Sequence, residues 1–570
     1  MDLRTARIAH EFACGYHFTA CSSSALIPFN IRHQCAVPLQ PQWAPTVRVW
    51  VRMTHLTASS TQQRMPDAVR PAQLTFLLIL SVIVVAWGAT MIAGSRQQNL
   101  ELYLLLLALY GLASSSFLFP RLRAGSDSIF QAPVLITLLC FLRFGLVPMV
   151  GLIDPGLVSV YFRGDYGYSL VKTLQLFAIG MVAFWIGCKL ACFRRLAWSR
   201  RDAGRTNEAR VASPLPVLVR LGIVYIVAVA ARIYLLRVGM YSYAGKEEVY
   251  WSNVASAQVL MVLGTLGTYA FVGAAIEKYT HPKDRVCHFV FRLVFASECT
   301  WGLISGMKQD LLTPFINVAI VLSVVNKKLP TRWLAVPIAV LIVVYPFSNS
   351  YKHFLQESGA SVTSLGGALE AGKDAIRQAT YINQSPSEWL ATGWQESELR
   401  MDLLQAMALS INLESKTSYL KGEERWWMLP YYPFVPRFLW PSKPVLTMGG
   451  RLSKALGADV HTSTAISYPG SLYLEAGVPG ILLGMLTLGM VAQWLTNRVR
   501  GPSDESHIFI YCNIIISLIN MEIDYFSYWV ALMRTFVCLS ILAWFFYGPL
   551  HRNSIVPGDV ARLATHSCES

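Results

Sequence analysis

Charged residues are scarce in this chain. Asp, Glu, Lys and Arg make up 14% of its 570 residues, whereas 54% are hydrophobic, and apolar runs recur along most of its length. Soluble domains carry about 25% charged residues. The scarcity excludes an ordinary soluble domain and indicates an all-α polytopic integral membrane protein.

Several familiar signatures are missing as well. The chain has no His/Cys/Asp spacing of the zinc type, no Gly-x-x-x-x-Gly-Lys phosphate loop and no serine nucleophile elbow. None of its eleven cysteines falls in residues 350–473, so that region is not a disulfide-stapled module. We therefore expect neither a metal nor a cofactor. No internal repeat of the kind found in many secondary transporters is evident.

What is present is a series of apolar segments long enough to cross a membrane. About twelve transmembrane helices are predicted, at 73–93, 99–119, 130–152, 170–192, 215–237, 253–276, 286–306, 309–325, 332–349, 474–495, 507–521 and 527–548. The segment at 286–306 carries Arg292 and Glu298, and the one at 309–325 is short and contains Pro314. An error in either would reverse the side assigned to every later loop.

Lysines and arginines in the short loops predict the orientation, because cytoplasmic loops retain cations. The loop after the fourth span carries six arginines: Arg194, Arg195, Arg200, Arg201, Arg205 and Arg210. Counting from it places four other basic loops on the same side. Both termini are then cytoplasmic, and one large loop at 350–473 is external. The net charge of +15 follows from this topology, so no nucleic-acid partner is implied.

The domain organisation follows from these spans. Residues 65–349 hold the first nine helices, 474–550 hold the last three, and 551–570 form a cytoplasmic tail. Residues 1–64 have no sustained period and no apolar stretch of signal-peptide length. Met65 opens a more ordinary membrane-protein start, which suggests that translation begins there and that 1–64 is an unstructured extension.

The external loop divides its charge unevenly. From His353 to Glu424 there are ten acids against five cations, whereas Arg425 to Ala458 contains five cations and no acid. The second half is therefore expected to attract anions. In the first half, Ser385, Pro386 and Glu388 form a capping-box start. Apolar residues at three- and four-residue spacing follow in 400–411 and form a stripe suited to lying against the bundle or the membrane surface. A packing role is the favoured interpretation of this stripe.

The segment YYPFVPRFLWPSKP, residues 431–444, is rich in proline and aromatic residues and has no acid. Its prolines lack an N–H and restrict the preceding residue, which predicts a stiff, extended loop. Its aromatic rings would sit at the headgroup level of the membrane and fix the direction of Arg437 and Lys443. The alternative is an interfacial anchor whose cations meet lipid phosphates without specificity.

The motif VPRFLWPSKP resembles the Pro-Arg-aromatic-x-Trp-Pro-x-Lys-Pro signature of bacterial polysaccharide repeat-unit polymerases of the O-antigen (Wzy) type. Two further segments resemble the same family: STAISYPGSLYLEAGVPG, with Glu475 before Gly477 and Gly480, and LISGMKQDLLTPF, with Lys308 where the family has arginine. The resemblance covers mainly residues 300–500.

This resemblance implies a membrane glycosyltransferase with a fold like that of O-antigen ligases of the GT-C type. Such polymerases join glycan repeat units carried on undecaprenyl pyrophosphate, without a metal, at the outer face of the bacterial inner membrane. Expected partners are the lipid-linked glycan, membrane lipid, and a chain-length regulator and flippase of the same pathway. The product would be O-antigen, capsule or exopolysaccharide.

The reaction needs cations beside the leaving pyrophosphate and a base beside the attacking hydroxyl. Arg437 is the first candidate for the pyrophosphate, since a guanidinium grips phosphate oxygens in a bidentate manner. Lys308, Lys443 and Arg451 follow. For the base, Glu475 and His461 are the main candidates and Asp459 remains a third. A single external histidine is more often an ordinary surface residue.

Charged side chains inside predicted transmembrane helices are candidates for a functional role, because burying a charge in the membrane is costly. Arg143, Arg232, Glu298 and Arg534 all fall in the predicted outer halves of their helices and are candidates for substrate contact. The alternative is mutual pairing, with Glu298 neutralising one of the arginines. Two rival functions also stay open: an O-antigen ligase-type transferase, and a polysaccharide flippase or transporter, which would not need so large an external loop.

Overall fold

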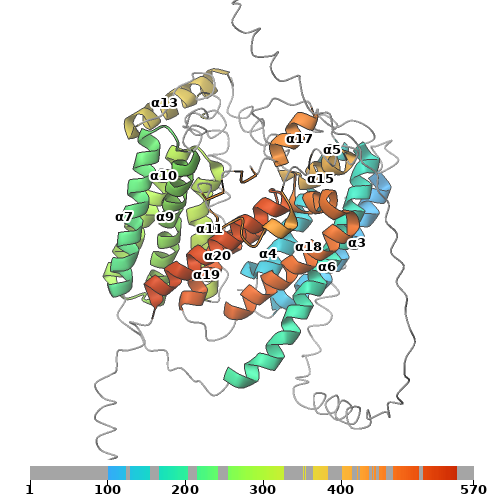
Figure 1. Ribbon diagram of the computed structural model, residues 1–570, viewed down its shortest axis with the longest axis horizontal. Helices are drawn as coiled ribbons and strands as arrows, with labels where there is room; N and C mark the ends of the chain where they lie inside the picture. Colours follow the sequence, from blue (N-terminus) through green and yellow to red (C-terminus); the bar gives the residue numbers. More distant parts are fainter. Residues whose placement is uncertain are drawn as a thin grey trace, which may run out of the picture. The chain divides into compact units, whose positions relative to one another are not determined.

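The computed structural model describes residues 100–123, 129–153, 166–202, 215–241, 254–326, 351, 354, 364–382, 401–413, 420, 424–435, 439–440, 442–444, 448–456, 466–499 and 505–548. Within these residues the secondary structure is helical and contains no strand (Figure 1). The all-α prediction is confirmed for them.

Nine of the helical segments in the described part are long and apolar enough to cross a membrane. They are α3 (Leu100–Arg123), the run Ala132–Leu152 that joins α4, η2 and α5, α6 (Tyr166–Asp202), α7 (Leu215–Arg237), α9 (Val254–Thr280), α10 (Arg285–Ser305), α11 (Lys308–Asn326), α18 (Tyr468–Val499) and α20 (Tyr525–Tyr547). A multi-pass membrane protein is the natural consequence.

Shorter helices complete the described structure. α15 (Leu403–Asn412) and α19 (Glu505–Ile519) are apolar, while α13 (Leu365–Ile382) and α17 (Met448–Leu456) belong to the predicted external loop. The predicted span at 507–521 corresponds to α19. The predicted spans at 73–93 and 332–349 lie outside the described residues, so the count of twelve stays a prediction.

The predicted spans at 286–306 and 309–325 are both helices, and a tight turn separates them. α10 ends at Gly306, which adopts a left-handed conformation with φ 66°, and α11 begins two residues later. Glycine favours such a C-terminal cap because it has no Cβ to clash.

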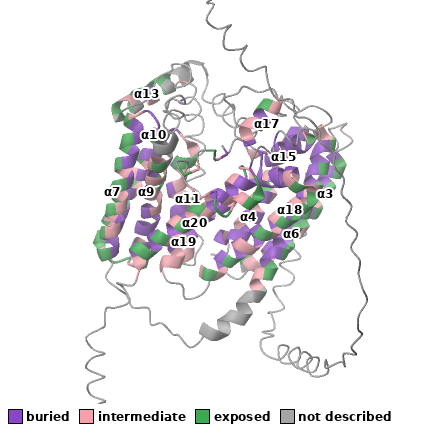
Figure 2. Cartoon of the chain, viewed as in Figure 1, coloured by how far each residue is buried: buried purple, intermediate pink, exposed green. Residues whose placement is uncertain are grey.

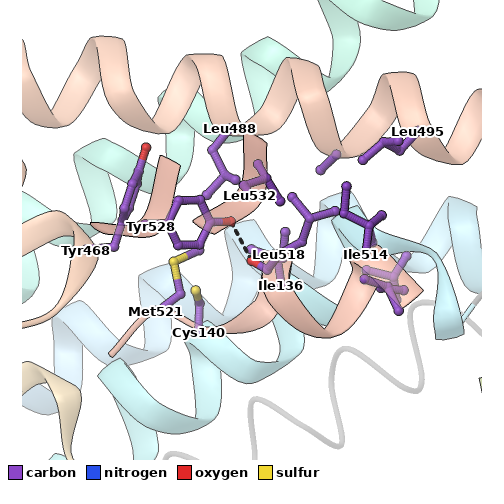
Figure 3. Packing of buried hydrophobic residues seen from close by; sticks show 14 of the residues in the cluster. Ile136, Cys140, Tyr468, Leu488, Leu495, Ile514, Leu518, Met521, Tyr528 and Leu532 are labelled. Carbon is purple, nitrogen blue, oxygen red and sulfur yellow. Dashed lines mark hydrogen bonds between the residues drawn. The ribbon is translucent and has the colours of Figure 1, made fainter. Parts of the chain in front are cut away.

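Contacts arrange the helices in two groups. α7, α9, α10 and α11 pack on one another, and α3, α4, α6, α15 and α18 form the second set, while α19 and α20 touch members of both. Figure 3 shows side chains of α4 and α18, from the second set, meeting those of α19 and α20 around Tyr528, whose hydroxyl donates to the Leu518 carbonyl at 2.8 Å.

Two glycines let α6 and α18 approach closely. A Cβ on Gly187 would lie 2.1 Å from the Leu486 carbonyl oxygen, and one on Gly489 would lie 2.1 Å from that of Phe184. Small residues of this kind are a recurrent packing device between membrane helices, where burial of apolar surface supplies little driving force. The α6–α18 pair is therefore defined by backbone proximity.

Helix segments that precede three loops predicted to share one side of the membrane lie close to one another. The Arg121 Nη2 donates to Gln493 Oε1 at 3.2 Å, and the Asn497 Nδ2 donates to the Ala191 carbonyl at 3.4 Å. The C-terminal ends of α3, α6 and α18 thus come together, as the positive-inside assignment of their loops requires. Which compartment they face remains a prediction.

Candidate functional site

The helix α18 is broken at its N-terminal end. Ala476 (φ −144°, ψ 21°) and Gly477 (φ 63°, ψ −146°) leave helical geometry, and Pro479 follows. A Cβ on Gly480 would lie 2.2 Å from the Leu472 carbonyl oxygen. Residues before and after the break are therefore in direct contact.

These contacts run in antiparallel order. The Tyr468 hydroxyl donates to the Gly484 carbonyl at 3.1 Å, and the Gly484 Cα lies against the Leu472 side chain. Residues 468–475, named here the half-helix, consequently fold back on the start of the long helix at 478–499. Glu475 is the last residue of the half-helix and lies half-buried at the turn. The Gly-x-x-Gly element in the sequence is what permits this reversal.

Hydrogen bonds fasten the half-helix to the loop before α20. The Ser467 N–H donates to the Glu522 carbonyl at 3.3 Å, and the Tyr468 N–H donates to that of Met521 at 2.9 Å. The Tyr525 N–H in turn donates to Ser471 Oγ at 2.7 Å. The half-helix and residues 521–525 therefore form one bonded unit.

Ser467 starts the half-helix in an unusual conformation. Its backbone φ is 62°, a value that residues other than glycine rarely adopt. Its Oγ accepts a hydrogen bond from the Gly470 N–H at 3.2 Å and so caps the start of the half-helix. A left-handed non-glycine residue costs about 1–3 kcal/mol and is common at functional sites.

Glu475 has a phenol as its partner. The Glu475 carboxylate lies close enough to the Tyr525 hydroxyl to act on it electrostatically, as do the carboxylates of Asp524 and Glu424. Tyr525 is buried, so its position is set by the protein and not by solvent. A carboxylate at a helix break, beside a buried phenol, fits the predicted role of a general base.

Arg143 approaches the same unit from α4. It lies in the π-helical turn η2 (Leu142–Leu146), where one extra residue widens the helix. Such π-bulges are rare and often mark functional sites. The Arg143 Nη2 lies 2.6 Å from Glu522 Oε1, and its Nε donates to the Met401 carbonyl at 3.3 Å. The structure thus brings Arg143 and Glu475 to the same bonded unit.

α15 supports this end of the bundle from within the predicted external loop. Its residues Leu403–Ile411 are all buried (Figure 2), and it contacts α6 and α18. Asp402 caps it by accepting the Gln405 N–H at 2.8 Å, and the Gln405 amide donates to the Tyr166 hydroxyl at 3.1 Å. The packing role predicted for this stripe is confirmed.

The proline- and aromatic-rich segment is less extended than its prolines suggested. A 3₁₀ turn at Trp426–Met428 continues into turns up to residue 435, with the Tyr432 N–H donating to Met428 at 2.8 Å and the Val435 N–H donating to Tyr431 at 3.1 Å. The prediction of an extended loop was wrong for residues 431–435. A proline, which has no N–H, fits a turn at the positions where the turn does not use that N–H in a hydrogen bond.

Lys443 closes this segment into a compact turn. The described residues between 426 and 444 are named here the aromatic turn. Its Nζ donates to the carbonyls of Tyr432 and Val435, each at 2.8 Å, and lies 4.2 Å from the centre of the Tyr432 ring. The Tyr432 hydroxyl donates to the Pro444 carbonyl at 2.6 Å. Lys443 therefore holds the backbone of the turn, a structural role for a predicted pyrophosphate ligand.

The aromatic turn docks beside Tyr525. The Tyr432 ring packs edge-on against Phe526 of α20 with centroids 5.1 Å apart. Its outer surface exposes five large hydrophobic side chains, those of Trp426, Trp427, Tyr431, Phe434 and Leu439. Exposed aromatic residues beside an apolar bundle fit contact with the lipid headgroup layer.

Two other predicted ligands pair with carboxylates. The Arg451 Nη2 lies 2.9 Å from both oxygens of Glu424, and its Nε donates to the Leu420 carbonyl at 3.0 Å. This pair ties α17 to the segment before the aromatic turn. Because Glu424 also acts on Tyr525, it belongs to the surroundings of Glu475.

Arg232 pairs with Glu298 inside the α7–α11 group. Its Nη1 and Nη2 lie 2.6 and 3.2 Å from the two carboxylate oxygens, and its Nε donates to the Gly264 carbonyl at 2.9 Å. A Cβ on Gly267 would lie 2.9 Å from the Arg232 guanidinium, so the pair needs that glycine. Burial raises the pKa of the neighbouring Tyr241, which stays protonated. Mutual pairing, one of the two predicted alternatives, is what the structure shows.

The remaining predicted residues are scattered or outside the description. Lys308 begins α11 and is half-buried, and Arg534 is an exposed residue of α20. Arg437, His461 and Asp459 lie outside the described residues. Within the described ones, no group of three His, Cys, Asp or Glu side chains could hold a metal ion.

Three residues of the site escaped the sequence analysis: Glu522, Asp524 and Tyr525. A signal for them exists, since two acids stand in the few residues between the predicted spans 507–521 and 527–548. Acids are unusual in so short a connection between two apolar helices.

Residues 225–501 match a family described as Domain of unknown function (DUF8712). The match runs from within α7 to just beyond the end of α18, and so includes the half-helix and the aromatic turn. No curated protein and no solved structure matches the chain.

Proposed function

We propose that this protein is a glycan polymerase that joins oligosaccharide repeat units carried on undecaprenyl pyrophosphate. The reaction would take place at the periplasmic face of the bacterial inner membrane, with both termini in the cytoplasm. O-antigen, capsule or exopolysaccharide would be the product.

One observation carries the proposal: Glu475 and Arg143 converge on a single bonded unit at one end of an apolar helix bundle. The unit comprises the half-helix and residues 521–525, and the aromatic turn packs against it through Tyr432 and Phe526. A carboxylate and a guanidinium beside a lipid-facing aromatic surface are the groups that transfer from a lipid pyrophosphate requires.

The chemistry assigns a role to each group. Glu475 takes the proton from the acceptor sugar hydroxyl as its oxygen bonds to the anomeric carbon of the donor chain. The bond from that carbon to the pyrophosphate oxygen breaks, and undecaprenyl pyrophosphate leaves with the electron pair. Arg143 and Arg437 stabilise the charge on the leaving oxygens. Tyr525 acts as a positioning residue, because its hydroxyl orients the Glu475 carboxylate.

The aromatic turn supports the assignment of Arg437. That arginine is two residues along the chain from Val435, whose carbonyl Lys443 holds. With Lys443 and Arg451 engaged by the fold, Arg437 is the remaining arginine of the acid-free half of the loop that sequence reasoning assigns to pyrophosphate. The turn itself serves membrane lipid contact through its exposed rings.

The test is polymerisation by the purified protein from lipid-linked repeat units in the absence of ATP and of any ion gradient. Chains longer than one unit are expected, and inactivation by Glu475→Gln should stop them. A ligase would move a finished chain to another acceptor and make no longer chains, and a flippase would move units across a vesicle membrane without joining them. A chain-length regulator and a flippase of the same pathway are the partners to add next.

A further inference from the structure

Three arginines of the predicted site each meet a carboxylate, and the three carboxylates differ in exposure. The pairs are Arg143 with Glu522, Arg232 with Glu298, and Arg451 with Glu424. The Glu522 side chain is 50% exposed, while those of Glu298 and Glu424 are 5% and 7% exposed. A half-exposed carboxylate can move into water at little cost, whereas a buried one cannot.

The fold uses the main chain of Glu522 and not its side chain. Its carbonyl accepts the Ser467 N–H, and its own N–H donates to Asn520 Oδ1 at 3.3 Å. These bonds persist wherever the carboxylate points. The side chain can therefore release Arg143 without detaching the half-helix from the loop before α20.

A contact other than Glu522 also holds Arg143. Its side chain is 17% exposed, its Nε donates to the Met401 carbonyl, and it projects from a π-helical turn in which Phe144 and Gly145 are buried. A guanidinium that is mostly removed from water needs an anion beside it. Either Glu522 or an arriving anion can meet that need.

We propose that the Glu522 carboxylate is an internal substitute for phosphate: it occupies Arg143 in the ligand-free protein and is displaced by the pyrophosphate group of the lipid carrier. A phosphate group presents more acceptor oxygens and more charge to a planar guanidinium than one carboxylate does. The inference rests on the proposed function, which supplies the pyrophosphate. Competition between the Glu522 carboxylate and pyrophosphate for Arg143 would lower the affinity of the protein for free undecaprenyl pyrophosphate. Release of that product would thereby be favoured.

The test measures the affinity of the full-length purified protein for inorganic pyrophosphate, by calorimetry, in phosphatidylcholine nanodiscs. Glu522→Gln removes the competing charge and should bind pyrophosphate about three- to tenfold more tightly than the wild type. Arg143→Gln should weaken binding at least tenfold, and the double variant should bind no more tightly than Arg143→Gln alone.

Asp374→Asn is the matched control. Asp374 is also 50% exposed and pairs with an arginine, Arg377, at 3.5 Å on the external-loop helix α13. The Asp374→Asn variant loses the same charge at a different place, so the affinity of that variant for pyrophosphate should differ from the wild-type affinity by less than twofold. Equal tightening by Asp374→Asn and Glu522→Gln would reduce the effect to general charge and overturn the proposal. Unchanged affinity in a folded Glu522→Gln protein would also overturn it.

Two further arms separate the alternatives. Should Glu522→Gln fail to fold, Glu522→Asp keeps the charge on a shorter side chain and should tighten binding by a smaller factor; no change there overturns the proposal. Repeating the measurement in phosphatidylglycerol nanodiscs should leave the affinity unchanged. If that lipid competes with pyrophosphate at Arg143, the site belongs to ordinary membrane phosphates instead.

Failure of the inference can be told from failure of the proposed function. If the wild type makes no polymer yet the pyrophosphate affinities change as expected, the polymerase assignment falls and the role of Glu522 stands. If polymer forms and Glu522→Gln does not tighten pyrophosphate binding, only the role of Glu522 falls.

Discussion

Lys443 shows how a side chain can be recruited by the fold although its charge suits a ligand. Its ammonium has three donors, and two of them bind carbonyls of the aromatic turn while the Tyr432 ring lies beneath it. The charge that the sequence offers to pyrophosphate thus stabilises a turn. Of the two cations in the motif, Arg437 is therefore the better residue to mutate as a test of pyrophosphate binding.

Arg437→Ala is expected to abolish polymer while protein level and membrane insertion stay normal. Loss of a charge-stabilising donor typically lowers the rate about a hundred- to a thousandfold, so single repeat units should accumulate on the lipid carrier. Chain length is read from gels of extracted polysaccharide. Arg437→Lys should restore activity only in part, because an ammonium lacks the planar fork.

The opposite result has a clear meaning. Normal chain length from a well-expressed Arg437→Ala protein would leave the motif as a membrane anchor, held by the exposed rings of Trp426 and Trp427. In that case lysine should serve as well as arginine.

Glu475→Gln should lower the polymerisation rate about a hundred- to ten-thousandfold, the usual contribution of general base catalysis. Tyr525→Phe keeps the ring and removes the hydroxyl that orients Glu475, so a smaller loss is expected. If Tyr525 positions the carboxylate, kcat of the Tyr525→Phe protein should fall while KM for the lipid-linked repeat unit stays unchanged; a purely structural role would lower the midpoint of thermal unfolding as well. An active Glu475→Gln protein would contradict this role and leave His461 as the main candidate for the general base.

Residue types and motifs named Glu475 and Arg143 as candidates, but not the neighbours that the structure places beside them. Glu522 and Tyr525 reach the site only because residues 521–525 bond to Ser467 and Ser471, some fifty residues earlier in the chain. Such pairing over long sequence separation leaves no periodic trace. The pairing of Arg232 with Glu298 was foreseen as an alternative, since a buried charge in a membrane needs a partner.

At the scale of elements, the α6–α18 contact is the most demanding. Gly489→Leu should destabilise the protein by on the order of 3 kcal/mol, because the new side chain meets the Phe184 carbonyl and backbone has to move. The midpoint of thermal unfolding in detergent should fall accordingly.

Gly222→Leu is the control for that experiment. Gly222 lies in α7, and a Cβ there meets nothing within 4 Å. Both variants put the same side chain on a membrane helix, so only the Gly489 variant should lose stability. Equal losses would mean that the substitution itself, and not helix contact, lowers the stability.

Periodicity and hydropathy identified most of the long helices but not the break in α18. The half-helix is itself apolar, so a hydropathy window runs across it and places the start of a span at 474. The AGVPG run at 476–480 was the local sign of a reversal. Whether such a run merely bends a helix or turns it back depends on the bonds that residues 467–471 find elsewhere.

For the whole molecule, the decisive prediction is topology. Single cysteines introduced in residues 196–212 should react with a membrane-impermeant maleimide only after the cells are opened, whereas those in 355–465 should react from outside the inner membrane. The reason is the retention of cations by cytoplasmic loops. Labelling of both regions from one side would remove the basis for an external active site.

The π-helical turn that holds Arg143 has a consequence for the history of the protein. A π-bulge corresponds to one extra residue in an α-helix, and each residue turns the helix by about 100°. Deleting one residue from 142–146 would restore a regular helix and rotate every side chain on one side of it relative to the other. Relatives that lack the pyrophosphate contact proposed for Arg143 are therefore expected to have lost it by a single-residue deletion, which leaves the helix intact and turns the arginine to another face.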